Sequence, residues 1–181
     1  MLRIGTGAAV LSLASPALAA PALIGIKRVN ARTLSFDCCN TGEKLKRVTY
    51  WADGRYDPHA LARIDYALRD YRSGDVYPIA PKVLDLLYRM GRTLDTDCRY
   101  ELFSGYRSPG TNAMLQRNEP EVATHSLHMK GQAVDIFLPG RSLHKIRDTA
   151  LAMGMGGVGY YPAADFLHVD VGRVRRWVGL G

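Results

Sequence analysis

The sequence predicts a single domain of the α+β class, in which helices pack on one side of a central antiparallel sheet. The chain has 181 residues, enough for one domain with a sizeable core. Hydrophobic residues make up 47% of it and charged residues 23%, as in ordinary globular proteins. Segments that alternate apolar and polar residues flank segments with helical periodicity, which favours a mixture of strands and helices. The sequence shows no internal repeat and no second domain.

The first third of the chain predicts a β-hairpin followed by a helix. Residues 33–37 alternate apolar and polar side chains, and residues 48–51 are a second strand candidate. A turn around Gly42 joins the two. Asp57 lies immediately before a proline and can accept hydrogen bonds from the first backbone N–H groups of a helix, which we expect Gly74 to end.

A second helix, a strand and a loop follow. Pro81 begins the helix, which carries an apolar stripe and is predicted to stop at Gly91. Residues 99–103 are a predicted strand that runs into a loop at 104–110, where Gly and Pro residues favour a tight turn. Loops held by rigid elements often carry functional residues. Residues 111–117 are predicted to form a short helix.

The C-terminal part predicts a strand, a helix and further strands. Residues 133–137 form the strand, and Ser142 can cap the helix after it. The glycine-rich segment 153–159 lacks the residues of a phosphate-binding loop, so we interpret it as leading into a strand that another group approaches closely. Residues 166–171 form the last clear strand, and 173–177 are an edge strand or a tail.

The chain is basic overall. It has 24 Lys and Arg residues against 17 Asp and Glu, a formal net charge of +7 and a pI near 9.5. This charge favours anionic partners such as nucleic acid, acidic lipid or cell-wall polymer. The positive residues are scattered rather than clustered in runs, so we expect no nucleic-acid partner.

Residues 1–19 have the pattern of a signal peptide. Arg3 precedes an apolar run at 4–13, and an Ala-x-Ala pattern follows, at which signal peptidase cuts. The run is too short to span a bilayer, so we expect no membrane span after cleavage. The predicted location is the periplasm, with the general-secretion and twin-arginine routes both open. The mature domain is predicted at residues 30–181.

The cysteines indicate neither a metal site nor a redox motif. Cys38 and Cys39 are adjacent and cannot easily bond each other, whereas one of them could pair with Cys98. The pairing stays open at this stage. Because no Cys-x-x-Cys motif is present, we favour buried, inert thiols.

Two histidines and an aspartate stand out as candidate metal ligands. His128 and Asp135 are seven residues apart, and His168 lies on the last clear strand. Period-two alternation places Asp135 on the opposite strand face from Val134 and Ile136, where an unpaired buried carboxylate would be costly. Imidazole nitrogens and carboxylate oxygens bind zinc, and three protein ligands leave one position open for catalysis. Spacing alone is weak evidence, because many chains contain such a set.

Three motifs surround these residues: Ser-x-His-x-x-Gly-x-Ala-x-Asp at 126–135, Ser-Gly-Tyr-Arg-Ser at 104–108 and Phe-x-His-x-Asp at 166–170. Together they resemble the zinc D-Ala-D-Ala carboxypeptidase and murein endopeptidase superfamily, to which hedgehog signalling domains are also similar. The murein endopeptidase K branch resembles the chain more closely, from Leu34 to the C-terminus. The similarity to this branch includes Thr-Gly-Glu at 41–43, Gly-Val-Gly-Tyr-Tyr-Pro at 157–162 and Gly-Arg-Val-Arg at 172–175.

The resemblance implies a periplasmic zinc enzyme of the hedgehog and D-Ala-D-Ala-peptidase fold that hydrolyses peptide cross-links in peptidoglycan. It implies Zn²⁺ as the cofactor, with His128, Asp135 and His168 matching the family's ligands position for position. Arg107 matches the arginine of the family's Tyr-Arg-Ser motif, whose expected role is to hold a substrate carboxylate or stabilise the oxyanion. We expect peptidoglycan as the partner and a monomeric protein.

Two aspartates, Asp165 and Asp170, are candidates for the proton acceptor of the implied reaction. Many superfamily members have a Glu three residues before the last His ligand, where this chain has the shorter Asp165. Asp170 shares a strand face with His168, roughly 6–7 Å along the strand. It could act as the base or orient an imidazole ligand. We expect His125 to be a solvated loop residue.

Two other functions stay open at this stage. A zinc D,D-carboxypeptidase would trim stem peptides and leave the bridges between them intact. A non-catalytic, zinc-containing module would bind peptidoglycan without turnover, because hedgehog domains resemble the same motif and work through partners. The residues do not indicate which cross-link is cut.

Overall fold

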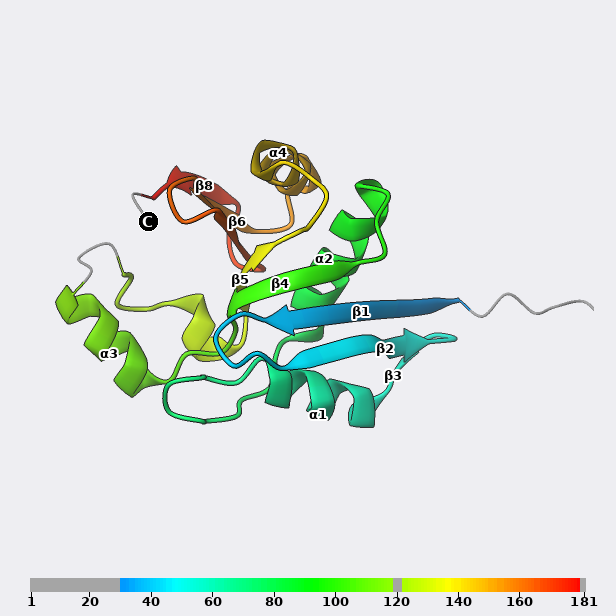
Figure 1. The fold of residues 1–181 in the computed structure, drawn as a ribbon, viewed down its shortest axis with the longest axis horizontal. Coiled ribbons are helices and arrows are strands. Elements are labelled where there is room, and N and C mark those ends of the chain that lie inside the picture. The colour runs from blue at the N-terminus through cyan, green and yellow to red at the C-terminus, as the bar shows by residue number, and fades with distance from the viewer. Residues whose placement is uncertain (1–29, 119–121, 180–181) are drawn as a thin grey trace, which may run out of the picture.

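The computed structural model describes residues 30–118 and 122–179, so the predicted signal peptide at residues 1–19 lies outside the described residues. Strands and helices both occur, which confirms the α+β class (Figure 1). No helix in the described ranges is long and apolar enough to cross a membrane. The strands are β1 (Ala31–Cys38), β2 (Lys44–Ala52), β3 (Arg55–Tyr56), β4 (Arg99–Ser104), β5 (Ala133–Phe137), β6 (Gly157–Tyr161), β7 (Phe166–Asp170) and β8 (Arg175–Val178). The helices are α1 (Pro58–Ala67), α2 (Pro81–Thr93), α3 (Pro109–Asn118) and α4 (Leu143–Met153), and a short 3-10 helix, η1 (Leu127–Lys130), precedes β5.

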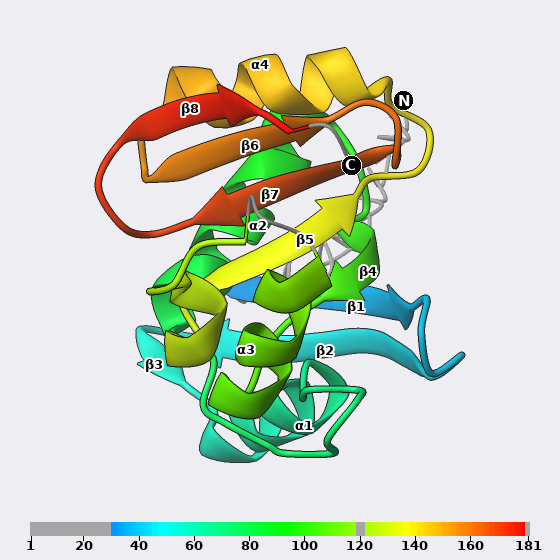
Figure 2. The same cartoon turned by 90° about the vertical axis from the view of Figure 1, so that its left-hand side faces the viewer.

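The strands form one eight-stranded sheet in the order β3-β2-β1-β4-β5-β7-β6-β8, which Figure 2 displays from bottom to top. The predicted β1–β2 hairpin is present, and β6 and β7 form a second antiparallel hairpin. Two neighbouring pairs are parallel, β1 with β4 and β6 with β8. The chain passes through α1 and α2 between β1 and β4, because parallel neighbours need a crossover connection. The sheet is therefore mixed, with antiparallel pairs in the majority.

The main hydrophobic core lies on one face of the sheet, beneath α1, α2 and α4. α1 contacts β2, α2 contacts β1, and α4 contacts β6 and β7. α3 lies on the other side of the sheet from α2 (Figure 2). The sheet face opposite the main core is therefore not covered by α1, α2 or α4. The core includes one fully buried side chain from each of five strands: Leu34, Tyr50, Tyr100, Ile136 and Leu167.

Two helix ends differ from the sequence-based prediction. α1 starts as predicted, because Asp57 Oδ1 accepts hydrogen bonds from two backbone N–H groups of the first turn, at 2.9 and 3.3 Å. It ends at Ala67 rather than at Gly74, because the residues between them fold into a hydrogen-bonded loop. α2 continues two residues beyond the predicted stop at Gly91. A Cβ at this position would lie 2.6 Å from Cys98 Sγ, so close packing explains the glycine.

The cysteine thiols are all free, so none of the possible pairings is formed. Cys38 and Cys98 are buried, and burial raises the pKa of Cys38 to about 11. These two thiols match the inert class that the sequence favoured. Cys39 is exposed, in contrast to the expectation that the thiols are buried.

Candidate metal centre

Four paired residues form a row across the sheet and organise the candidate site. Asp135 of β5 is paired with His168 of β7. His168 is paired with Gly159 of β6, which is paired in turn with Trp177 of β8. Residues of one row point to the same face, and this face is the one opposite the main core. The register therefore brings a carboxylate, an imidazole and an indole together.

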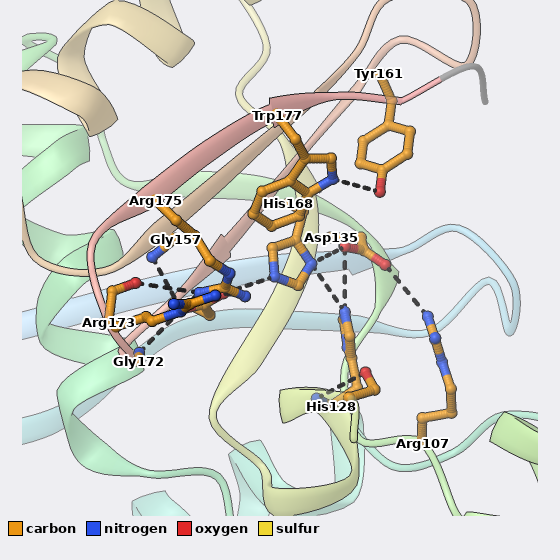
Figure 3. Close-up of polar contacts among 12 residues, drawn as sticks. Arg107, His128, Asp135, Gly157, Tyr161, His168, Gly172, Arg173, Arg175 and Trp177 are labelled. Carbon is orange, nitrogen blue, oxygen red and sulfur yellow. Dashed lines mark hydrogen bonds and ion pairs between the residues drawn. The ribbon is translucent and has the colours of Figure 1, made fainter. Parts of the chain in front are cut away.

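His128 reaches this row from η1, just before β5. Ser126 Oγ accepts a hydrogen bond from the His128 backbone N–H at 3.3 Å and caps η1. Gly131 ends η1 with φ +61°, and a Cβ there would lie only 2.1 Å from the carbonyl oxygen of Pro78. Glycine is thus required both for the backbone conformation and for the close packing. The turn places the His128 side chain beneath Asp135 and His168 (Figure 3).

The three predicted ligands converge on one point. His128 Nε2 lies 3.1 Å from His168 Nδ1, and Asp135 Oδ1 lies 2.9 Å from His168 Nδ1 and 3.3 Å from His128 Nε2. All three residues are buried, with exposures of 2%, 6% and 8% for His128, Asp135 and His168. Ligand atoms about 2.0–2.2 Å from a tetrahedral zinc ion lie about 3.3–3.6 Å from each other. This donor set therefore fits zinc after a small expansion.

Both imidazole rings are fixed through the nitrogen that faces away from this point. His128 Nδ1 lies 2.7 Å from the Gly105 carbonyl oxygen, and His168 Nε2 lies 3.0 Å from Asp170 Oδ2. A carbonyl or an ionised carboxylate can only accept, so each of these ring nitrogens carries the proton. His128 Nε2 and His168 Nδ1 are therefore the ring nitrogens that face Asp135, and in the neutral form of each ring this nitrogen carries the lone pair. Metal-binding histidines are generally held in this way.

Asp170 is a fully buried carboxylate behind His168. Its Oδ1 accepts hydrogen bonds from the backbone N–H groups of Gly157 and Gly172, both at 2.9 Å. Arg175 donates to both oxygens, to Oδ1 at 3.1 Å and to Oδ2 at 2.7 Å. A Cβ at Gly157 would lie 2.5 Å from Asp170 Oδ2, so this glycine makes room for the carboxylate. Both oxygens of Asp170 thus already hold donors on the side of His168 away from the candidate centre.

The surroundings shift the pKa values of the clustered groups in different directions. Burial lowers the pKa of His128 and favours its neutral form. Burial acts the same way on His168, but hydrogen bonds to Asp135 and Asp170 outweigh it and raise the pKa of His168. Burial alone would raise the pKa values of the two carboxyl groups, whereas their donors hold both well below the usual range. The cluster therefore contains two permanent anions that can balance a cation.

Arg107 lies beside the cluster with a guanidinium group that is only partly used. Its Nη2 is 3.7 Å from Asp135 Oδ2, and its Nη1 is 3.5 Å from Asn112 Oδ1. The buried Nε has no hydrogen-bond partner within the described part of the chain. Figure 3 shows the side chain directed at Asp135. The guanidinium can therefore bind a further anion or a developing negative charge.

Asp165 and His125 lie outside the cluster. Asp165 is exposed in the turn between β6 and β7, where its φ of +52° is left-handed. Its carboxylate makes no hydrogen bond or ion pair with any residue that the structure describes. It lies three positions before His168, which corresponds to roughly 10 Å along a strand. His125 is exposed in the loop before η1, as expected.

Aromatic side chains lie beside His168, towards β6 and β8. The Trp177 ring lies 5.1 Å from the His168 ring, and its Nε1 donates a hydrogen bond to Tyr161 Oη at 3.0 Å. Tyr161 stacks on Phe166 at 4.4 Å. A Cβ at Gly159 would lie 2.5 Å from the Trp177 ring, so the glycine provides the space for the indole.

The sequence analysis assigned no role to several contributing residues. Gly105 and Arg175 lie within the motifs at 104–108 and 172–175, but their contacts appear only in the fold, and Asn112 lies in no motif. Trp177 was predicted only as part of an edge strand or tail. The pairing of β8 with β6 brings it over His168.

The cluster has the composition of a candidate metal site. Two imidazole nitrogens and a carboxylate oxygen that face one point could hold a metal ion. The chain belongs to the family of the peptidoglycan L,D-endopeptidase MepK, whose family model matches residues 27–177. This match confirms the family that the motifs indicated.

Known members show the extent of the similarity. The peptidoglycan L,D-endopeptidases MepK of Escherichia coli strain K12 and of Shigella flexneri are each 39% identical to this chain over 168 residues. The match covers 92% of this chain and 91% of either relative. A probable peptidoglycan L,D-endopeptidase MepK of Haemophilus influenzae is 39% identical over 150 residues, covering 82% of this chain and 80% of that protein. No solved structure gives a significant match.

Proposed function

We propose that this protein is a zinc-dependent endopeptidase that hydrolyses L,D peptide cross-links of bacterial peptidoglycan. The observation that carries the proposal is the convergence of His128 Nε2, Asp135 Oδ1 and His168 Nδ1 within 3.3 Å of one another. The relatives at 39% identity are named for the same reaction, over nearly the whole chain. The donor set and the family thus support one activity.

His128, Asp135 and His168 would hold the zinc ion. When bound there, zinc supplies a Lewis acid for a scissile carbonyl and lowers the pKa of water. The Gly105 carbonyl and Asp170 keep the two imidazole rings in the tautomer and orientation that binding requires. Burial of the three ligands strengthens their electrostatic interactions with a cation.

Arg107 would hold a carboxylate of the substrate or stabilise the oxyanion. Peptide stems of peptidoglycan are anionic, and a planar guanidinium can donate two parallel hydrogen bonds to a carboxylate. The contacts of Nη2 with Asp135 at 3.7 Å and of Nη1 with Asn112 at 3.5 Å are both long, so these two nitrogens keep hydrogen-bonding capacity. The net charge of +7 also favours an anionic polymer as substrate.

The two candidate catalytic aspartates receive different roles. Both oxygens of Asp170 already hold donors, so we assign it to positioning His168 rather than to proton transfer. Asp165 is the candidate proton acceptor that this leaves, because its carboxylate is exposed and carries no partner among the described residues. To act, it has to reach the centre from the β6–β7 turn.

Purified peptidoglycan that contains both L,D and D-Ala-linked bridges tests the activity. We expect the L,D-linked dimers to disappear, chelator to stop the reaction and added zinc to restore it, as measured by muropeptide masses. Dimers that stay intact while stem peptides shorten would indicate a carboxypeptidase. Binding without products from zinc-loaded protein would indicate a non-catalytic module.

The ligand assignment has a test of its own. His128→Ala should abolish stoichiometric zinc binding, measured by metal analysis after gel filtration, because it removes one of three ligands. The exposed His125 offers a matched control, and His125→Ala should retain one zinc ion per chain. Retention of zinc by His128→Ala would refute the assignment.

We also propose that residues 1–19 are removed on export to the periplasm. The N-terminal apolar run and the Ala-x-Ala pattern support this proposal. N-terminal sequencing of protein recovered from the periplasm should begin at Ala20. A protein that retains Met1 there would contradict the proposal.

A further inference from the structure

The loop of residues 104–108 makes three contacts with the candidate centre, one of which is the hydrogen bond from the Arg107 backbone N–H to the His128 carbonyl at 3.3 Å. The Gly105 carbonyl accepts a hydrogen bond from His128 Nδ1 at 2.7 Å, and Arg107 extends its guanidinium towards Asp135. The loop lies between β4 and α3 and has no strand partner beyond Ser104. Its conformation must therefore be fixed by the segments packed against it.

The connection between α1 and α2 supplies this support. The Tyr106 backbone N–H donates to the Leu68 carbonyl at 2.7 Å, and the Ser108 backbone N–H donates to Asp70 Oδ2 at 2.8 Å. A Cβ at Gly105 would lie 2.3 Å from the Leu68 carbonyl oxygen, so the two backbones are in direct contact. The loop is thus held on either side of Arg107.

Asp70 is the charged group in this support, and it is only 2% exposed. Its Oδ1 accepts from the Arg72 backbone N–H at 2.9 Å, and it has no ion pair among the described residues. Burial alone would raise the pKa of Asp70, but hydrogen bonds from Thr111, Ser108 and Arg72 lower it to about 2. A buried carboxylate therefore stays ionised on backbone and hydroxyl donors.

The same carboxylate lies at the start of α3. Ser108 Oγ accepts the Thr111 backbone N–H at 3.2 Å and so caps the helix, while the Ser108 backbone bonds to Asp70. A negative charge is favourable at a helix N-terminus. One turn further on, Asn112 Oδ1 contacts Arg107 Nη1 at 3.5 Å, and Asn112 Nδ2 donates to the Ala123 carbonyl at 3.1 Å.

These contacts connect Asp70 to both ends of one functional side chain. The backbone next to Arg107 is held through Ser108, and Arg107 Nη1 lies 3.5 Å from Asn112 Oδ1, on the helix whose first turn Asp70 contacts. We propose that Asp70 is a positioning residue, whose carboxylate sets the loop and α3 so that Arg107 and the Gly105 carbonyl face the candidate centre. Its kinetic consequence rests on the proposed peptidase activity, whereas its effect on metal binding rests only on the zinc ligands proposed for the same site.

Asp70→Asn tests the proposal, because it keeps the side-chain shape and removes the charge. Asp75→Asn is the matched control, since Asp75 is exposed in the same connection and, within the described ranges, its side chain hydrogen-bonds only with Ser73. We expect Asp70→Asn to lower kcat/KM on cross-linked peptide by on the order of tenfold to a hundredfold. The control should stay within about threefold of the wild type.

A double-mutant cycle separates positioning from a merely structural role. In the Arg107→Ala background, Asp70→Asn should lower kcat/KM by less than about a further threefold, because the side chain that Asp70 positions is absent. Losses that multiply would overturn the proposal. If Asp70→Asn does not fold, Asn112→Ala replaces it in the same cycle, with the same expectation and the same contrary result.

Zinc affinity keeps the test independent of turnover. Through Gly105 and His128, Asp70→Asn should weaken zinc binding about tenfold in a chelator competition, and Asp75→Asn should leave it unchanged. If the wild-type protein cuts no peptidoglycan, only the proposed function is refuted, and the zinc affinity of Asp70→Asn then decides the positioning role of Asp70. If Asp70→Asn, Asp75→Asn and the wild type bind zinc equally tightly, the positioning role is overturned.

Discussion

The imidazole of His168 is held between two carboxylates, and the His-x-Asp spacing in β7 provides the second of them. Residues two apart on a strand share a face, so Asp170 can reach the ring nitrogen that points away from Asp135. Arg175 and two backbone N–H groups keep Asp170 ionised and in place. A carboxylate so surrounded is suited to orienting a ligand and poorly suited to collecting a proton.

Asp170→Asn should therefore reduce zinc affinity by about tenfold to a hundredfold, because the His168 ring loses its charged acceptor. Chelator competition measures this, with circular dichroism to show that the variant folds. Unchanged zinc affinity would remove Asp170 from the positioning role.

Asp165→Asn should behave differently. Asn tolerates the left-handed backbone of this position, so the variant should fold normally and keep full zinc affinity. If Asp165 accepts the proton, kcat should fall by about 10² to 10⁴ with metal still bound. A kcat equal to that of the wild type would exclude Asp165 as the base.

The lowered pKa of Asp70 predicts that the free energy of unfolding decreases at acidic pH. Its pKa in the folded protein is about 2, below the ordinary value of 3.8, so its stabilisation is present above about pH 4 and is lost as the pH falls towards 2. The loss should be on the order of 1–2 kcal/mol. Urea denaturation at several pH values should show the wild type losing more stability than Asp70→Asn, and parallel curves would contradict the prediction.

At the level of elements, the glycines of β6 let neighbouring strands complete the site. Gly157 leaves space for Asp170 and Arg175, and Gly159 leaves space for the Trp177 ring over His168. A glycine normally weakens a strand. Its presence in a strand therefore indicates that another group approaches the backbone closely. Here the approaching groups are Arg175 and Trp177 of β8, at the edge of the sheet, and Asp170 of β7.

Gly159→Ala should displace the indole, because its Cβ would lie 2.5 Å from the Trp177 ring. We expect a loss of about 1–3 kcal/mol in the free energy of unfolding and a red shift of tryptophan emission. Gly110→Ala is a suitable control, since its Cβ would meet its nearest neighbour only at 4.0 Å. Equal stability of the two variants would show that the Trp177 position adapts freely.

At the level of the whole molecule, the arrangement of layers separates the main core from the His and Asp cluster. α1, α2 and α4 cover one face of the sheet, and the register of β5 and β7 places the side chains of Asp135 and His168 on the other. The ligands come from η1, β5 and β7, so a bound ion would join segments about 40 residues apart in sequence. Binding to such a preformed site stabilises the folded state.

Metal removal should therefore lower the melting temperature. At zinc concentrations about a hundredfold above the dissociation constant, the stabilisation is about 2.7 kcal/mol, and chelator should abolish it. His128→Ala should melt at the same temperature with and without chelator. An equal shift in both proteins would mean that the chelator acts elsewhere.

Much of the fold follows from local patterns in the sequence. Alternation identified the strands at 133–137 and 166–171, and the Asp57-Pro pair identified the start of α1, because caps and side-chain periodicity are local properties. The end of α2 was misplaced, since Gly91 is explained by a contact with Cys98 from a later segment. The parallel pairs in the sheet were also missed, because strand order depends on contacts between distant segments.

The sequence by itself determined the candidate ligand types, their strand faces and, through the motifs around them, the family. Only the tertiary structure decided which atoms of these residues face one another and which neighbours hold them. The Gly105 carbonyl, Asp70 and Trp177 acquire their contacts from strand register and loop packing, which bring together residues tens of positions apart. Hydrogen bonds and ring contacts act over a few ångströms in space, whereas a sequence pattern records only neighbours along the chain.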